Sequence, residues 1–246
     1  MPCHLPPSRR RLRPPHRSRA DAAGHRPGRD VSRRRRGRDR HARPAVGANL
    51  SEVRCFGWGD ALYTAYHDEE WGRPVRDERR VYERLCLEGF QSGLSWLTVL
   101  RKREAFRSAF AGFDPEVVAE FTEDDVERLL LDEAIVRHRG KIEATISNAR
   151  ATLALREAGR PLHELLWIHA PAERPAPRSH ADWVSTTPQS EELAKVLRRA
   201  GFRFIGPTTV HAAMQACGVM NDHLVDCVVR ADVEAVRTSF GLSYPS

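Results

Sequence analysis

Apolar side chains recur at helical spacing through most of the chain beyond residue 77, and strand-like alternation of apolar and polar residues is nearly absent. After Asp77, Val81 and Leu85 fall on one side of a helix, and the segment from Ser95 to Phe110 repeats this pattern. Asp77 and Ser95 are residue types that cap helix N-termini. The pattern therefore predicts an all-α fold.

Capping residues and helix breakers locate the remaining helix ends. Asp114-Pro115 combines an N-cap with a proline in the first turn, and Thr122 precedes a segment with acids in its first turn. Gly159 ends a long helix, and Ser190 is the expected N-cap of a later one. The predicted helices cover residues 116–121, 123–130, 141–157 and 191–199.

A short basic turn joins two of these helices across residues 132–141. Backbone N–H groups at a helix start, with the cations of Arg137, Arg139 and Lys141, could bind a phosphate there. An ordinary helical hairpin with a solvated basic corner fits the same residues equally well. The spacing alone leaves both readings open.

Charge is distributed very unevenly along the 246 residues, whose net charge is +7. Residues 1–48 contain 15 Arg, no Lys and three Asp, so this segment carries +12 and the remainder carries −5. The basic character of the whole chain is therefore no evidence that the folded part binds a polyanion. Any DNA affinity there must come from local patches.

The segment 1–48 is rich in Arg, Pro and Gly and has almost no large apolar residues, so we expect it to be disordered. It could be a DNA-tethering or targeting arm, a solvated appendage, or an extension upstream of the true start near Val46 to Val53. We divide the chain into this tail and a helical domain at 49–246. No apolar run approaches the ~20 residues that span a bilayer, so we place no segment in a membrane. The few, scattered cysteines and the lack of a secretory signal lead us to expect a cytoplasmic protein.

Cysteine and histidine are spaced as metal ligands are. The five cysteines are too few and scattered for a disulfide framework. His223 and Cys227 lie four positions apart, and Cys55 and His67 form a second pair far upstream. Together they would make a four-ligand, structural zinc site that joins the start of the domain to its end. A buried cysteine that happens to lie four residues from a histidine is the alternative.

Glu88 stands out because it lies between apolar residues and two glycines, near the end of an apolar helix. A carboxylate there is costly to bury unless it is paired or used, although an exposed position in the last helical turn is also possible. Aromatic residues gather in the same part of the chain and could stack on a planar or cationic base, or simply pack in the core. They are Trp58, Tyr63, Tyr66, Trp71, Tyr82 and Trp96.

Several of these residues fall in motifs that occur together in one family. They are Cys55-Phe-Gly-Trp58, Tyr63-Thr-Ala-Tyr66-His67-Asp-Glu-Glu-Trp71-Gly, Leu87-Glu88-Gly-Phe-Gln-Ser-Gly-Leu-Ser-Trp96, Arg137-His-Arg-Gly-Lys141-Ile, Asn148-Ala, Gly201-Phe-Arg-Phe204-Ile-Gly206 and Gln215-Ala-Cys-Gly-Val-Met-Asn-Asp-His223. From about Arg54 to Cys227 the chain resembles the DNA-3-methyladenine glycosylase I family of the helix-hairpin-helix superfamily. It departs from the family by an extra Phe56, by Ala134 where a hairpin glycine is usual, and by His211 in place of a frequent tyrosine.

The resemblance implies one structural zinc per chain, bound by the residues at Cys55, His67, His223 and Cys227. It also implies that Glu88 lies in a base pocket, with the aromatic rings of Tyr66, Trp71 and Trp96 around an extruded base. Residues 129–141, with Arg137, Arg139 and Lys141, would contain the DNA-binding hairpin.

We therefore expect a monomeric base-excision enzyme, associated with the nucleoid, that acts on alkylated double-stranded DNA. It would flip an N3-alkylated adenine out of the duplex and hydrolyse its N-glycosidic bond, with Glu88 as the catalytic residue and no cofactor other than zinc. Two rivals remain. A glycosylase/lyase would form a Schiff base through Lys141, and a non-catalytic DNA-binding module would need neither Glu88 nor the aromatic rings.

Overall fold

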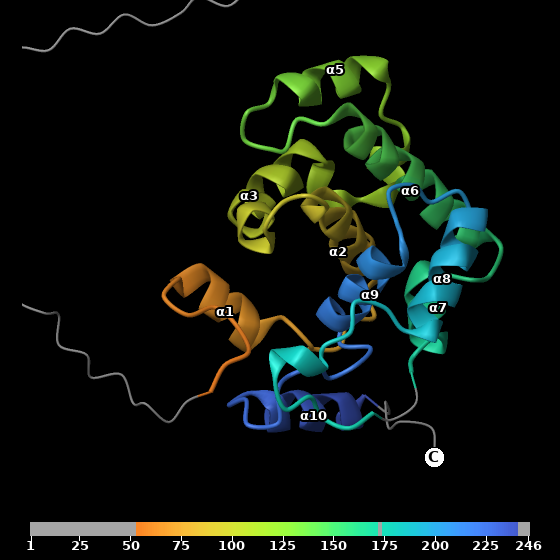
Figure 1. Ribbon diagram of the computed structural model, residues 1–246. Coiled ribbons are helices and arrows are strands. Elements are labelled where there is room, and N and C mark those ends of the chain that lie inside the picture. Colours follow the sequence, from red (N-terminus) through yellow and green to blue (C-terminus); the bar gives the residue numbers. More distant parts are fainter. Residues whose placement is uncertain (1–52, 172–173, 241–246) are drawn as a thin grey trace, which may run out of the picture. The chain divides into compact units, whose positions relative to one another are not determined.

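The computed structural model describes residues 53–171 and 174–240, and these ranges form helices without a β-strand (Figure 1). The all-α prediction is confirmed. The helices are α1 (Ala61–Glu69), α2 (Glu78–Gln91), α3 (Trp96–Ala109), α4 (Pro115–Ala119), α5 (Glu123–Leu131), α6 (Arg139–Glu157), α7 (Leu162–Ile168), α8 (Pro188–Arg199), α9 (Pro207–Ala216) and α10 (Arg230–Ser239), with short 3-10 turns η1 (Ala111–Phe113) and η2 (His180–Asp182). No helix in these ranges has the length and apolar character needed to cross a membrane. The tail at 1–48 lies outside the described residues.

Three predicted helix starts are confirmed by their capping bonds. The Asp77 carboxylate accepts from the backbone N–H of Arg80 at 2.8 Å and begins α2. The Ser95 hydroxyl accepts from Thr98 N–H at 3.2 Å and begins α3. Asp114 caps α4 in the same way, with proline in the first turn.

The predicted start of α8 was wrong by three residues. The N-cap is Thr187, whose hydroxyl accepts from Ser190 N–H at 3.2 Å, and the Ser190 hydroxyl in turn accepts from Thr187 N–H at 2.9 Å. Ser190 is therefore the second member of a capping box and lies inside the helix. The start of α6 also differs, because His138 caps it and the helix begins at Arg139, not Lys141.

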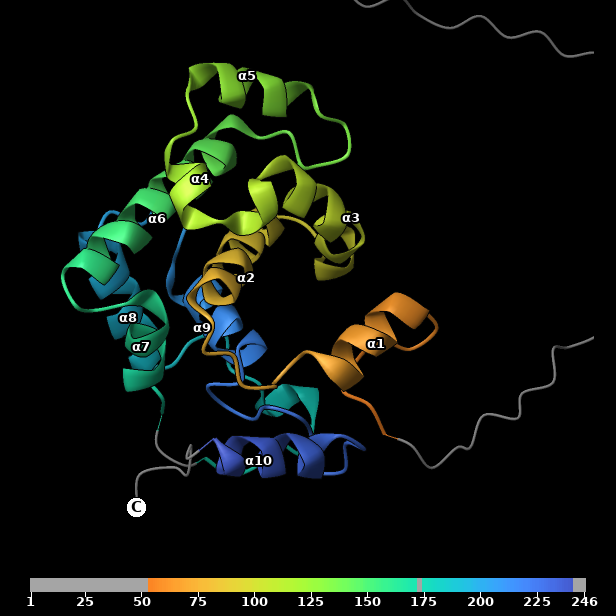
Figure 2. The ribbon, with the colours of Figure 1, turned by 180° about the vertical axis from the view of Figure 1, so that it is seen from behind.

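Helix α2 lies at the centre of the helical domain and packs against α3, α6, α7 and α9 (Figures 1 and 2). Side chains on all its sides are buried as a result, including Tyr82, Leu85 and Phe90. Tyr82, which we grouped with the possible stacking rings, belongs to this core: its ring lies 6.0 Å from that of Phe113 and its hydroxyl donates to the carbonyl of Thr145.

The two ends of the described chain meet beside α1 and α10. Val53 forms an isolated parallel bridge with Cys227, and the N–H of Val228 donates to the carbonyl of Val53 at 3.0 Å. A second apolar cluster, which includes Tyr66, Trp71 and Leu224, fills the space beneath this contact. Segments some 170 positions apart in sequence thus form one structural unit.

Candidate functional site

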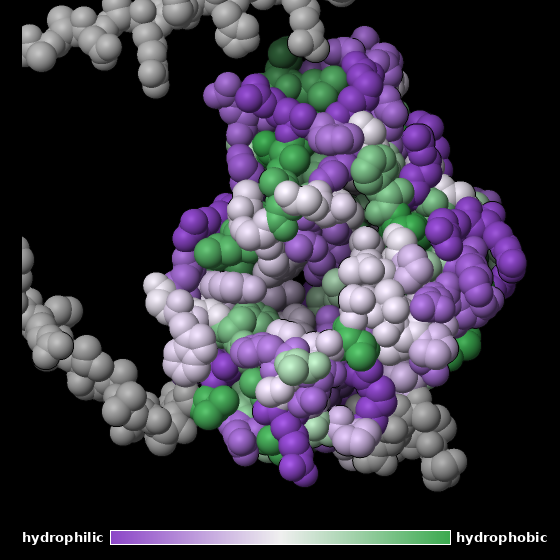
Figure 3. Space-filling model, in the orientation of Figure 1, coloured by the Kyte–Doolittle hydropathy of each residue, from purple (hydrophilic) through white to green (hydrophobic). Residues whose placement is uncertain are grey.

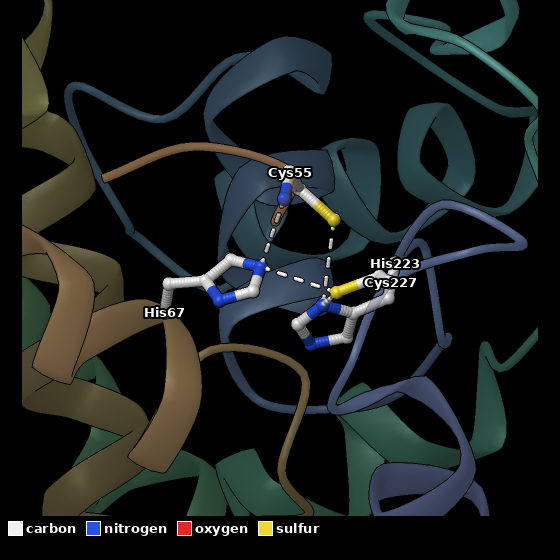
Figure 4. A group of neighbouring side chains, drawn as sticks. All are labelled: Cys55, His67, His223 and Cys227. Atoms are coloured by element: carbon white, nitrogen blue, oxygen red, sulfur yellow. Dashed lines mark hydrogen bonds between the residues drawn. The ribbon is translucent and has the colours of Figure 1, made fainter. Parts of the chain in front are cut away.

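The four predicted metal ligands come together at the contact between the chain ends, and all four are buried (Figure 4). Cys55 comes from the loop before α1, His67 from α1, and His223 and Cys227 from the loop before α10. One potential ligand atom from each lies within 4.8 Å of all the others. The chain therefore has a cluster that could hold a metal ion.

The distances in this cluster match the edges of a tetrahedral site. The Nδ1 atom of His223 lies 3.5 Å from Sγ of Cys55 and 3.4 Å from Sγ of Cys227, which is 3.5 Å from Nε2 of His67. A tetrahedron built with the usual Zn–S and Zn–N bond lengths has S···N edges of about 3.5 Å. Hydrogen bonds from Cys55, His223 and His67 lower the pKa of the Cys227 thiol, which favours the thiolate that a metal requires.

Each histidine is held by a partner on its other ring nitrogen. Nδ1 of His67 lies 2.7 Å from the carboxylate of Asp68, and Nε2 of His223 lies 3.0 Å from the carbonyl oxygen of Trp71. Such contacts fix the orientation and tautomer of ligating histidines. Asp68 was missed at the sequence level, although its position directly after a ligand histidine was a usable signal.

Glu88 lies in the last turns of α2 with only 7% of its surface exposed. Its carboxylate has no hydrogen bond or ion pair with any residue that the structure describes. Burial therefore raises the pKa of Glu88 to about 8, and the nearby charge of Arg84 lowers it in part. A buried carboxyl group without a partner is costly to the fold and typical of a site that waits for a ligand.

Two of the predicted base-binding rings lie together near this carboxyl group. The ring centroids of Tyr66 and Trp96 are 5.3 Å apart, and the charge of Glu88 contributes to the raised pKa of Tyr66 after burial itself. Nε1 of Trp96 is buried without a hydrogen-bond partner. The two rings line a cavity of about 20 Å³, which has room for about one water molecule and not for a purine.

The space-filling view shows a hollow in the middle of one face, between α1 and α9 (Figure 3). Helix α1 carries Tyr63 and Tyr66, and Cys217 follows the end of α9. The pKa values of all three groups are raised first by burial and further by the charge of Glu88. Glu88 therefore acts electrostatically on groups that lie on α1 and directly after α9, the two helices that flank the hollow.

Trp71 contacts the metal cluster directly. Its ring centroid is 4.6 Å from that of His223 and 6.3 Å from that of His67. The extra Phe56 fills the same layer, 4.9 Å from His67 and 5.1 Å from Trp71. Trp58, by contrast, is 65% exposed. The Cys2His2 cluster and the aromatic rings of Trp71 and Phe56 thus pack directly against each other.

The basic turn lies between α5 and α6, as predicted, but its two arginines already form ion pairs with glutamates of this chain. Arg137 pairs with Glu133 at 3.4 Å, and Arg139 pairs with Glu123 at 2.5 Å and with Glu127. Ala134 adopts no left-handed conformation, so the loss of the usual glycine there costs the backbone nothing.

Lys141 points into the protein. Its ammonium donates to the carbonyl oxygens of Phe90 and Ser92 at 2.8 and 2.6 Å, and burial lowers its pKa. This placement argues against the predicted phosphate contact through that ammonium. The side chain instead holds the C-terminal end of α2, a few residues beyond Glu88.

A family model for methyladenine glycosylases matches residues 57–231. The DNA-3-methyladenine glycosylase 1 of Escherichia coli K12 is 48% identical over 179 residues, which is 71% of this chain and 95% of that protein. The DNA-3-methyladenine glycosylase of Haemophilus influenzae is 42% identical, covering 71% of this chain and 96% of that protein. A solved structure of the 3-methyladenine DNA glycosylase I of Staphylococcus aureus, which addresses 3-methyladenine recognition, superposes with a TM-score of 0.69 at 36% identity and covers 72% of this chain and 95% of that one. The chain belongs to the methyladenine glycosylase family.

Proposed function

We propose that this protein removes N3-alkylated adenine, 3-methyladenine above all, from DNA by hydrolysing the bond between the base and its sugar. The observation that carries the proposal is the buried, unpartnered carboxyl group of Glu88 beside the rings of Tyr66 and Trp96. Family membership supports it, and so does the substrate named for the relatives.

The chemistry of the substrate explains why a carboxylate and aromatic rings suffice. Alkylation at N3 gives the adenine a positive charge, so the base is already a good leaving group. An electron-rich ring and a carboxylate each favour a cation over neutral adenine. The carboxylate also accepts hydrogen bonds from the edge of the base. Recognition of the flipped base can then supply most of the discrimination between N3-alkylated adenine and neutral adenine.

The reaction itself balances without a redox step or a covalent enzyme intermediate. The C1′–N9 bond breaks and its electron pair neutralises the cationic base, which leaves an oxocarbenium-like sugar. A water molecule adds to C1′ and loses a proton, so the products are free 3-methyladenine and an abasic site. In this proposal Glu88 contacts the base, together with Tyr66, Trp96 and, by our sequence prediction, Trp71; the lack of a partner for the Glu88 carboxyl group among the described residues supports this role.

We further propose that the buried Cys2His2 cluster binds one zinc ion. Four protein ligands fill a tetrahedral coordination shell, so the metal would serve the fold and leave no position for an activated water. It would hold the segment before α1 against the segment before α10, next to the packed rings of Trp71 and Phe56.

We also propose that the turn between α5 and α6 contacts the backbone of double-stranded DNA as a helix-hairpin-helix, with the protein acting as a monomer. Arg137 and Arg139 are exposed there, and a phosphate would have to displace their carboxylate partners. The lyase alternative is disfavoured because the Lys141 amine is bound to two carbonyl groups.

The decisive experiment for this function is product analysis. The purified protein is incubated with methylated double-stranded DNA, and the released bases are separated by chromatography and compared with authentic 3-methyladenine. We expect free 3-methyladenine and abasic sites, with no strand cleavage by the protein. If no base is released although the protein binds the DNA, it is a non-catalytic binding module.

A further inference from the structure

A buried arginine lies one helical turn before Glu88. Arg84 is on α2, and only 9% of its surface is exposed. Its guanidinium donates a hydrogen bond to the carbonyl oxygen of Ala216, the last residue of α9, and it lines the same small cavity as Tyr66 and Trp96. Residues at i and i+4 share one helix face, so the Arg84 and Glu88 side chains lie on the same side of α2.

The other titratable groups around Glu88 carry no charge near neutral pH. From α1 these are Tyr63 and Tyr66, and beyond α9 it is Cys217, whose pKa burial raises to about 11. Burial raises the pKa values of both tyrosines as well. Among the residues that the structure describes, Arg84 is the charged group that acts on Glu88, and it favours the ionised carboxylate.

We propose that Arg84 is a positioning residue that favours ionisation of Glu88 and so prepares this carboxyl group for a cationic base. The inference rests on the proposed function, because only a cationic ligand gains from an ionised Glu88. Anchored on the carbonyl of Ala216, Arg84 stays within Coulomb range of the carboxylate without forming an ion pair with it. The carboxylate therefore keeps its lone pairs free for the base.

A merely structural Arg84 would behave differently. As a cation at the C-terminal end of α9 it would stabilise that helix, and its loss would weaken the protein equally at every pH. If Arg84 acts through Glu88, its replacement should lower excision in a pH-dependent way, and only in a protein that retains Glu88.

The experiment compares wild type, Arg84→Met and Arg84→Lys, each alone and combined with Glu88→Gln. Excision of 3-methyladenine is followed in single turnovers at subsaturating enzyme, from mildly acidic to mildly alkaline pH. In parallel, the ¹³C chemical shift of the Glu88 carboxyl group is titrated by NMR, with Glu88→Gln to assign the signal. Zinc content and far-UV circular dichroism confirm that each variant is folded.

We expect Arg84→Met to raise the pKa of the Glu88 carboxyl group by about one unit, which lowers excision about tenfold on the acidic side of the profile. The loss should shrink as the pH rises through the pKa of Glu88 and should be absent in the Glu88→Gln background, and Arg84→Lys should retain most of the activity. An unchanged Glu88 titration, or the same loss at every pH with and without Glu88, would overturn the proposal. If Arg84→Met shifts the titration while wild type releases no base, the electrostatic role stands and the proposed function is what fails.

Discussion

Replacement of Glu88 by glutamine should stabilise the folded protein, because wild type buries an acid that has no partner. The shift of its pKa from an ordinary 4.5 to about 8 means that the folded state holds the proton more tightly than the unfolded state. Each pH unit in that interval costs wild type about 1.4 kcal/mol. The penalty is absent below about pH 4.5, grows as the pH rises, and reaches roughly 4–5 kcal/mol at and above about pH 8.

The assay is urea unfolding at a series of pH values, with zinc saturating so that metal binding is the same for both proteins. The free energy of unfolding of Glu88→Gln minus that of wild type should increase from mildly acidic to alkaline pH. Glu83→Gln is the matched control on the same helix: Glu83 is paired with Arg107 at 2.7 Å, so its loss should give no such gain. A difference for Glu88→Gln that is flat with pH, or that falls, would refute the reasoning about the buried acid.

Three other predictions concern the rest of the chain. The purified protein should contain one zinc ion, and Cys227→Ser should bind it more weakly and unfold at a lower temperature; elemental analysis without zinc, in the absence of chelators, would refute the site. Deletion of residues 1–48 should preserve the single-turnover excision rate at saturating enzyme and lower only the salt-sensitive part of DNA affinity; a large fall in that rate would show that the tail shapes the site. Lys141→Met should destabilise the protein by about 1–3 kcal/mol, because two carbonyl groups at the end of α2 lose a charged donor. With wild type, borohydride should trap no protein–DNA adduct; a trapped adduct would show that the protein is a glycosylase/lyase.

The metal ligands and several helix starts could be predicted because their signals are local. His223 and Cys227 are four residues apart, and the caps at Asp77 and Asp114 need only a short side chain before an apolar segment. The start of α8 was misplaced although Thr187-Pro188 offered the stronger signal, an N-cap followed by proline in the first turn.

The electrostatics of the site could not be predicted from sequence, because they depend on tertiary contacts. That Lys141 turns inward follows only from the position of the carbonyl groups of Phe90 and Ser92, some 50 residues earlier. The influence of Arg84 on Glu88 depends on the burial of both residues on α2, which packs against α9. Arg84 and Glu88 are four positions apart, which places them on one helix face, but the sequence contains many such pairs and does not single this one out.

The central claim is that Glu88 recognises the cationic base, and single-turnover excision of 3-methyladenine by wild type, Glu88→Gln and Glu88→Ala tests it most directly. A charge-assisted hydrogen bond contributes roughly 1.5–3 kcal/mol, so at saturating enzyme Glu88→Gln should excise the base about ten- to a hundredfold more slowly. Glu88→Ala should be slower still, with zinc content and fold unchanged. If both variants excise 3-methyladenine at the wild-type rate and bind the free base equally well, Glu88 takes no part in recognition and the account is wrong.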